Sequence, residues 1–208
     1  MIYRLGELFC GPGGIAWGAM NADIGIPDFR IVHQWANDYD ADTCNTYRHN
    51  ICPDAPETVY HEDIRKFDMS HLAPIDALAF GFPCNDYSVV GEQKGMNGVY
   101  GPLYSYGVKA LKMFKPIWFL AENVGGLKNA NDGKAFTKII AELKGAGYTV
   151  VPHLYKFEEY GIPQARHRII IVGIRNDIDV VYHVPSTALY ADVDNSCRTA
   201  IEVPPIPQ

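Results

Sequence analysis

Short apolar runs that alternate with amphipathic stretches are the feature that most restricts the fold of this chain. Strand-like runs lie at 5–10, 30–37, 76–82, 117–121, 148–155 and 168–174, and helical spacing lies at 14–22, 40–49, 103–114 and 132–145. Strands that alternate with helices are joined by right-handed crossovers into a parallel sheet. The pattern therefore predicts an α/β, doubly wound, mostly parallel sheet of the Rossmann-like type.

Length and composition fit one substantial domain followed by a different tail. The chain has 208 residues, of which 48% are hydrophobic, so a real core can form. From Val184 onward the sequence turns polar and irregular, and three prolines in 204–207 cannot continue a helix or strand. We expect a domain over 1–183 and a linker over 184–208.

Charge and cysteine content restrict the partners. No apolar run approaches the ~20 residues of a membrane span, so we expect no membrane and an intracellular protein. The net charge of −6 argues mildly against nucleic acid. The five cysteines include no Cys-x-x-Cys pair, so neither a disulfide framework nor a metal site is expected.

A glycine turn follows the first strand. Phe9, Gly11, Gly13 and Gly14 stand where doubly wound folds bind ligands, but they do not match the Gly-x-Gly-x-x-Gly phosphate fingerprint. A tight strand-to-helix turn without a ligand fits the glycines equally well.

Two acidic positions follow later strands. Asp38, about 25 positions after the glycines, stands where a ribose hydroxyl is bound, and Tyr39 would lie against an adenine face. Asp63, followed by Ile64, would accept a hydrogen bond from the exocyclic amine of adenine. A helix cap or a solvated loop is the alternative for each. Together with the glycines they describe an adenosine pocket without a pyrophosphate cradle.

Reactive side chains follow three further strand positions. Cys84 comes after Phe82-Pro83, where active sites lie, although a lone cysteine is often a buried core residue. Glu122 follows five apolar residues and should be partly desolvated, which suits a group that holds or shares a proton. Strand alternation places Arg166 and Arg168 on one side, aimed at a polar or anionic ligand. A loop cap and a solvated strand edge are the alternatives for the glutamate and for the arginines.

The order of these motifs resembles the DNA (cytosine-5)-methyltransferase family. Phe-x-Gly-x-Gly-Gly, Pro-Cys, Glu-Asn-Val and Gln-x-Arg-x-Arg follow one another over about 5–177. The resemblance implies that Cys84 adds to C6 of a flipped-out cytosine, that Glu122 shares a proton at N3, and that Arg168 holds O2. Arg166 and Asn123 would support the pocket, and the loop 85–100 would close over DNA.

The resemblance also implies S-adenosyl-L-methionine as the cofactor and S-adenosyl-L-homocysteine as its product. The matching cofactor-binding positions are Phe9, Gly11, Gly13, Gly14, Asp38, Tyr39, Asp63, Ile64, Phe82 and Leu103. The chain departs from the family at Glu7, where Asp is usual, and at Asn85, where Gln is usual. Tyr100-Gly101-Pro102-Leu103 also replaces Arg-Gly-x-Leu.

The family's target-recognition domain and last motif are missing from these 208 residues. The chain is then either a truncated part of a longer enzyme or one subunit of a split enzyme, with double-stranded DNA and a second polypeptide or C-terminal region as partners. Most phosphate contacts would belong to the missing part, which accounts for the negative charge. A cytoplasmic protein of bacterial, archaeal or phage origin is expected, with a restriction-modification role among the possibilities.

Three competing interpretations remain. A tRNA cytosine-5 methyltransferase shares the motifs, but its usual Cys-Phe-Thr tripeptide is not present. A truncated module would bind cofactor or protein without methylating. A nicotinamide-dependent oxidoreductase is not supported by the glycine pattern or by Pro83-Cys84-Asn85.

Overall fold

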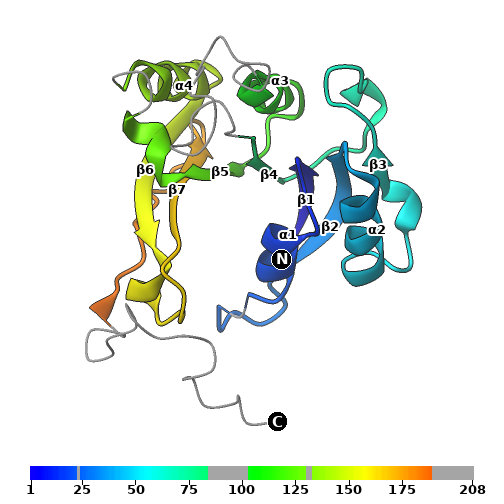
Figure 1. Cartoon of the computed structure of the whole chain (residues 1–208), viewed down its shortest axis with the longest axis horizontal. Helices are drawn as coiled ribbons and strands as arrows, with labels where there is room; N and C mark the ends of the chain where they lie inside the picture. Colours follow the sequence, from blue (N-terminus) through cyan, green and yellow to red (C-terminus); the bar gives the residue numbers. More distant parts are fainter. Residues whose placement is uncertain (23, 84–102, 130–132, 189–208) are drawn as a thin grey trace.

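The protein folds around one seven-stranded sheet flanked by helices (Figure 1). The computed structural model describes residues 1–22, 24–83, 103–129 and 133–188. The strands are β1 Ile2–Leu8, β2 Arg30–Asp38, β3 Val59–His61, β4 Ala77–Gly81, β5 Trp118–Val124, β6 Tyr148–Lys156 and β7 His167–Arg175. The helices are α1 Gly14–Met20, α2 Ala41–Asn50, α3 Tyr104–Phe114 and α4 Lys134–Gly145. Short 3-10 turns are η1 Pro56–Thr58, η2 Met69–His71, η5 Gly125–Asn129 and η6 Phe157–Tyr160.

The strand order is β3-β2-β1-β4-β5-β7-β6, and the first five strands of this order are paired in parallel. The mostly parallel, doubly wound sheet predicted from the sequence is confirmed. Each predicted strand and helix is present, with ends that differ by a few residues. Parallel pairing brings the carboxyl ends of β1 to β5 to one edge of the sheet, where ligands bind in such folds.

β7 is the strand for which a purely parallel arrangement is wrong. It pairs antiparallel with β5 on one side and with β6 on the other. The connection from β6 to β7 holds only η6, and a parallel crossover needs a dozen or more residues, usually with a helix. The chain therefore turns back on itself between these strands. As a result, the beginning of β7 lies beside the end of β5.

Two hydrophobic clusters cover opposite faces of the sheet. One joins α3 and α4 to the sheet through buried residues such as Leu111, Leu143 and Phe119. The other joins α1 and α2 through Ala16 and Tyr47, among others. Figure 1 shows α3 and α4 together on one side of the sheet, with α1 and α2 beside its N-terminal strands. No helix in the described ranges is long and apolar enough to cross a bilayer.

The chain after β7 folds back onto the domain. The hydroxyl groups of Tyr155 and Tyr182 lie 2.8 Å apart, and Tyr160 Oη donates to the carbonyl of Pro185 at 3.2 Å. The chain just before the predicted linker thus contacts β6, and the start of the linker contacts η6. Its residues from 189 onward lie outside the described ranges, and the boundary at 183/184 remains a prediction.

Gly107 lets α3 pack closely on the sheet. A Cβ atom added at Gly107 would lie 2.5 Å from the ring of Phe80, whereas a Cβ at Gly145 in α4 would meet nothing within 4 Å. Both glycines are helical, so helix propensity favours alanine at both by about 1 kcal/mol. We expect Gly107→Ala to lower the free energy of unfolding by about 1–3 kcal/mol through overpacking. We expect Gly145→Ala to raise it slightly. Urea denaturation of both variants checks the pair, and equal effects would contradict the packing argument.

Candidate active site

A pocket lies at the carboxyl ends of the parallel strands. It holds about 500 Å³ of empty space, including its open mouth. Its walls come from β1, β2, the loop after β3, the end of β4 and the start of α3. The lining residues are Phe9, Asn37, Tyr39, Asp63, Ile64, Arg65, Pro83 and Leu103.

Five of the predicted cofactor-binding residues line this pocket together. They are Phe9, Tyr39, Asp63, Ile64 and Leu103. Sequence positions nearly a hundred residues apart thus meet at one place, because the ends of the parallel strands and the start of α3 lie at one edge. Two aromatic rings, two aliphatic side chains and one carboxylate form a lining that suits a flat, largely apolar ring carrying a hydrogen-bond donor.

Other predicted cofactor residues contribute differently. Phe82 is buried in the core rather than lining the pocket. The Asp38 carboxylate accepts hydrogen bonds from the backbone N–H of Gly11 at 2.8 Å and of Asp40 at 3.1 Å. Asp38 therefore ties the end of β2 to the glycine turn after β1. A ribose contact at Asp38 remains a prediction.

The glycine turn has a backbone that most residues cannot adopt. Gly11 and Gly13 have φ angles of 53° and 98°, and Phe9 has a φ of 55°. A Cβ at Gly13 would lie 2.6 Å from the side chain of Ile51, so glycine is required there for space as well as for conformation. Gly14 begins α1 directly after this turn. A positive φ at a non-glycine residue is unfavourable and is common at functional sites.

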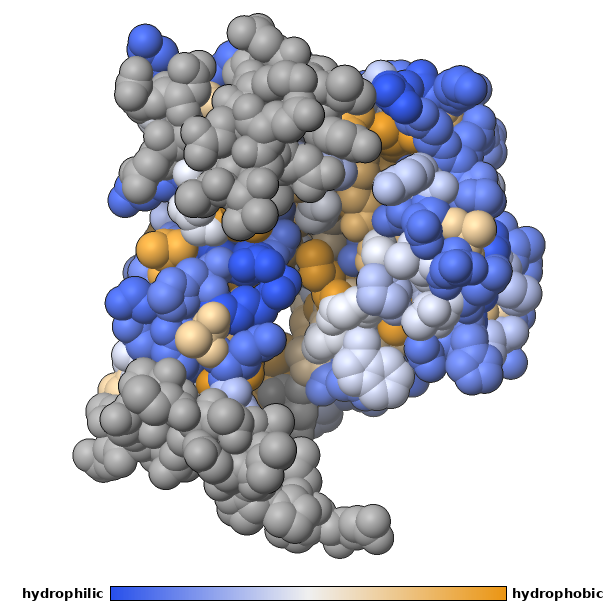
Figure 2. Space-filling model, in the orientation of Figure 1, coloured by the Kyte–Doolittle hydropathy of each residue, from blue (hydrophilic) through white to orange (hydrophobic). Residues whose placement is uncertain are grey.

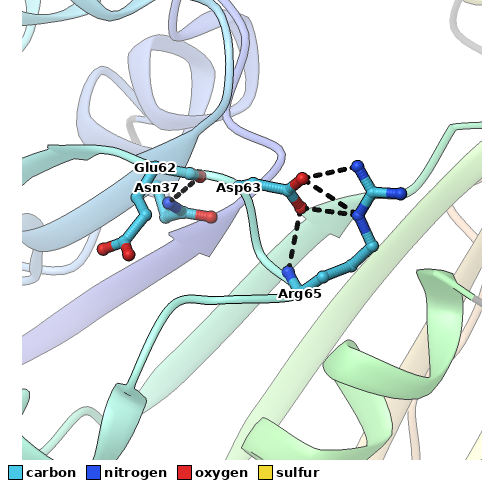
Figure 3. Close-up of polar contacts among 4 residues, drawn as sticks. All are labelled: Asn37, Glu62, Asp63 and Arg65. Carbon is cyan, nitrogen blue, oxygen red and sulfur yellow. Dashed lines mark hydrogen bonds and ion pairs between the residues drawn. The ribbon is translucent and has the colours of Figure 1, made fainter.

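The sequence interpretation gave no site role to three of the lining residues, Asn37, Arg65 and Pro83. Arg65 forms a close ion pair with Asp63, and the Asn37 amide holds the backbone just before Asp63 (Figure 3). Hydrogen bonds from Arg65 lower the pKa of the Asp63 carboxyl to about 2. The only sequence signal for this ion pair was an arginine two residues after an acid in a turn. That pattern is common on protein surfaces, so it did not indicate a site.

Glu122 and the two arginines predicted to share one side meet at the end of β5. Arg168 Nε lies 2.8 Å from Glu122 Oε1, and Arg166 Nη2 lies 3.7 Å from the same oxygen. The Glu122 side chain is 25% exposed, so it is partly desolvated as predicted. The two guanidinium groups do converge on one anion, which in this structure is the glutamate itself.

Asn123 links this cluster to the chain segment that leads to Cys84. The side chain is buried, and its Nδ2 donates to the carbonyl of Phe82 at 3.0 Å. Its Oδ1 accepts from the N–H of Val124 at 2.8 Å. Asn123 thus fixes the backbone two residues before Cys84. Cys84 and the loop 85–100 lie outside the described residues, so their predicted roles stay predictions.

A comparison with known protein families decides the assignment. The sequence profile described as C-5 cytosine-specific DNA methylase matches residues 3–202. The chain belongs to this family.

Its relatives in the C-5 cytosine-specific DNA methylase family include Type II methyltransferases from bacteria. The chain is 59% identical to Type II methyltransferase M.BbvI of Brevibacillus brevis, over 89% of this chain and 52% of the relative. It is 34% identical to M.NgoFVII of Neisseria gonorrhoeae, over 86% of this chain and 46% of the relative. The chain spans about half the length of these relatives.

Solved structures share the fold. The S. pombe Dnmt2 methyltransferase superposes with a TM-score of 0.64 at 17% identity, over 88% of this chain and 52% of that chain. The Entamoeba histolytica methyltransferase EhMeth gives the same TM-score at 18% identity, over 89% and 57%. The Rossmann-like α/β class of the sheet is therefore shared with other methyltransferases.

Glu7, at the position where the resemblance led us to expect Asp, is buried beneath α2. Its carboxyl accepts a hydrogen bond from Tyr47 Oη at 3.0 Å, and that hydroxyl also lies 3.1 Å from His33 Nδ1. Loss of water on burial raises the pKa of Glu7 to about 8, and nearby Asp38 adds to the effect.

Among the described residues no group of three or more His, Cys, Asp or Glu is arranged to hold a metal ion.

The raised pKa of Glu7 predicts a specific pH dependence of stability. The pKa is about 8 in the folded chain and near 4.5 when unfolded, so the unfolded chain binds fewer protons between these values. Stability from this group is therefore present below pH 4.5 and falls as pH rises through 8. The free energy of unfolding of Glu7→Gln minus that of the wild type should therefore rise between pH 5 and pH 8. We expect a rise of at least about 1.4 kcal/mol, which is the value of one pKa unit.

Chemical denaturation at pH 5, 6.5 and 8 measures this difference. Glu57→Gln, which changes an exposed glutamate, is the control and should leave the pH dependence of the wild type unchanged. A wild-type chain whose stability relative to Glu7→Gln is constant across the three pH values would refute the buried protonated carboxyl.

Proposed function

We propose that this chain is the catalytic part of a DNA (cytosine-5)-methyltransferase, which transfers a methyl group from S-adenosylmethionine to C5 of cytosine in DNA. The observation that carries the proposal is the cluster at the end of β5. Glu122 there contacts both Arg166 and Arg168, and Asn123 holds the backbone that leads to Cys84. This cluster and the lined pocket share the same edge of the sheet.

The pocket residues fit S-adenosylmethionine. Phe9 and Tyr39 offer aromatic surface for a purine ring, Ile64 and Leu103 offer aliphatic contacts, and Asp63 offers an acceptor for the adenine amine. The glycine turn lies at the same edge of the sheet, and it lets a ligand approach the backbone. When bound, S-adenosylmethionine supplies an activated methyl group on a positively charged sulfur.

The residues of the chain would prepare the base for that transfer. The Cys84 thiolate forms a bond to C6 of a flipped-out cytosine, and the electron pair of the C5–C6 double bond moves toward C5 and N3. Glu122 shares a proton at N3, and Arg168 holds O2. Both guanidinium contacts are to Glu122 Oε1, and we infer that Oε2 is the oxygen that meets the base. After C5 takes up the methyl group, for which S-adenosylhomocysteine would be the leaving group, loss of the C5 proton restores the C5–C6 double bond and expels the Cys84 thiolate.

An open apolar groove supports the proposal that further polypeptide completes the enzyme. On the face of β4, β5 and β7 away from α3 and α4, the groove holds about 1590 Å³ of space, including open solvent. Half-buried Trp118, Leu120 and Ile170 line it together with Ile15 of α1. Figure 2 shows apolar side chains in the hollow between the two halves of the molecule.

An uncovered apolar groove of this kind is typical of an interaction surface. We propose that chain beyond residue 208 or a second polypeptide covers it and carries the recognition domain, with 184–208 as the linker. Double-stranded DNA is the substrate in this proposal. A role in bacterial restriction-modification would place the protein in the cytoplasm.

The nucleophile can be trapped directly. In a preparation completed by the missing region and supplied with S-adenosylmethionine, DNA carrying 5-fluorocytosine should form a covalent adduct, because fluorine at C5 cannot leave as the proton does. We expect Cys84→Ala to abolish the adduct and methyl transfer while DNA binding survives. The control Cys197→Ala removes a cysteine outside the motifs and should form the adduct. An adduct that persists in Cys84→Ala would show that another residue is the nucleophile.

The 208-residue chain alone should bind S-adenosylmethionine weakly and should not methylate duplex DNA. The groove and the recognition function are incomplete without more polypeptide, so both cofactor affinity and DNA contacts are reduced. Calorimetry and transfer of a radiolabelled methyl group to duplex DNA measure the two quantities. Robust methylation by the chain alone would overturn the proposal that it is only part of the enzyme.

A further inference from the structure

The carboxylate of Asp63 is held from several directions by a single arginine. Arg65 Nε lies 2.9 Å from both Asp63 oxygens, and Arg65 Nη2 lies 2.5 Å from Oδ2. The backbone N–H of Arg65 adds a hydrogen bond to Oδ1 at 3.0 Å. Figure 3 shows the planar guanidinium group facing the carboxylate. Contacts of this kind fix the plane of the carboxylate as well as its position.

The backbone that carries Asp63 is fixed independently. Asn37, which is 1% exposed, donates from Nδ2 to the carbonyls of Tyr60 at 3.0 Å and Glu62 at 2.9 Å. The N–H of Glu62 donates to the carbonyl of Asp38 at 3.0 Å. The chain before Asp63 is therefore attached to the end of β2, so the remaining freedom of the acid is rotation of its side chain. Arg65 restrains that rotation.

We propose that Arg65 is a positioning residue that orients Asp63 to select a purine with an exocyclic amine at C6 over one with a carbonyl oxygen there. The inference rests on the proposed function, because it assigns the adenosine part of the cofactor to the pocket. An ionised carboxylate only accepts hydrogen bonds, so it attracts the amine of adenine and repels the oxygen of hypoxanthine. That discrimination requires the carboxylate oxygen to point at the C6 substituent.

Orientation rather than charge is the contribution of Arg65. The pKa of the Asp63 carboxyl is about 2 when it is paired with Arg65, and its ordinary value is 3.8. The carboxyl is therefore ionised at neutral pH with or without Arg65. Lysine at position 65 keeps a positive charge but lacks the planar fork that makes parallel hydrogen bonds. Arg65→Lys should therefore resemble Arg65→Gln in its selectivity.

The pair is exposed enough to be changed without unfolding the chain. The side chains of Arg65 and Asp63 are 56% and 30% exposed, and exposed ion pairs contribute little to stability. The chain also provides a matched control. Arg4 makes two side-chain hydrogen bonds to Asp76, at 2.8 Å and 3.0 Å, and one from its backbone N–H at 2.9 Å, with similar exposure, but it lies near the start of β1, away from the pocket.

The experiment compares two ligands by calorimetry on the 208-residue chain. S-adenosylhomocysteine carries the amine, and S-inosylhomocysteine carries the oxygen at the same position. We expect the wild type to prefer the adenosyl ligand by about tenfold or more, the size of one hydrogen bond's net contribution. Arg65→Gln, Arg65→Lys and Asp63→Asn should each lose most of this preference. Arg4→Gln should retain it.

The outcomes separate the inference from the proposed function. If the wild type prefers the adenosyl ligand and both Arg65 variants keep the full preference, positioning by Arg65 is refuted while the cofactor pocket stands. If Arg65→Lys keeps the preference and Arg65→Gln loses it, charge rather than orientation is responsible, and the inference is overturned. If the wild type binds neither ligand, both the pocket assignment and the inference fail.

Discussion

The pairing of β5 between β4 and β7 is the constraint on which the candidate active site depends. On one side β5 runs parallel to β4, with Gly81 opposite Glu122. On the other side it runs antiparallel to β7, with Val124 opposite Arg168. Three segments far apart in sequence therefore bring their chemical groups to the same end of one strand. The hydrogen bond from Asn123 to the carbonyl of Phe82 extends this connection beyond the ladder.

The reversed direction of β7 makes this arrangement possible. Arg168 stands near the beginning of its strand, whereas Glu122 stands near the end of β5. Had β7 run parallel, Arg168 would have lain beside Trp118 at the start of β5, four residues and about 13 Å from Glu122 at 3.3 Å per residue. The short connection through η6 therefore decides the chemistry as well as the topology, because it excludes the parallel crossover.

The sequence predicted most of the fold because burial leaves a periodic record. Strands such as β4 are buried along nearly their whole length, and amphipathic helices such as α4 show the 3.6-residue spacing. Periodicity reports which residues are buried but carries no information on strand direction, so the antiparallel direction of β7 within the mostly parallel sheet could not be predicted. Positions after strand ends, such as Asp63 and Glu122, were predictable because parallel strands collect their carboxyl ends at one edge.

Side-chain partners were much less predictable than positions. Asp38 accepts a hydrogen bond from the N–H of Gly11, and Asp63 pairs with Arg65, whereas the sequence offered each acid only as a ligand contact, a helix cap or a solvated loop residue. An acid at a strand end can bind a ligand, cap a helix or accept a hydrogen bond from a neighbouring backbone group. The free energies of these alternatives differ by amounts that the sequence pattern does not show. Glu7 was recognised as one methylene longer than the family's usual residue. Its bond to Tyr47 could be known only once the packing of α2 on the sheet was known.

The open groove connects the completeness of the enzyme to its chemistry. Glu122 and Arg166 line this groove as well as forming the cluster at the end of β5. If further polypeptide covers the groove, as proposed above, it would remove water from around their 3.7 Å contact, and a lower local dielectric strengthens such a contact several-fold. A covered groove would also hold Glu122 in fewer orientations. The same polypeptide that brings DNA recognition would then complete the electrostatic surroundings of the proposed proton-sharing carboxyl, so that activity and assembly are physically linked.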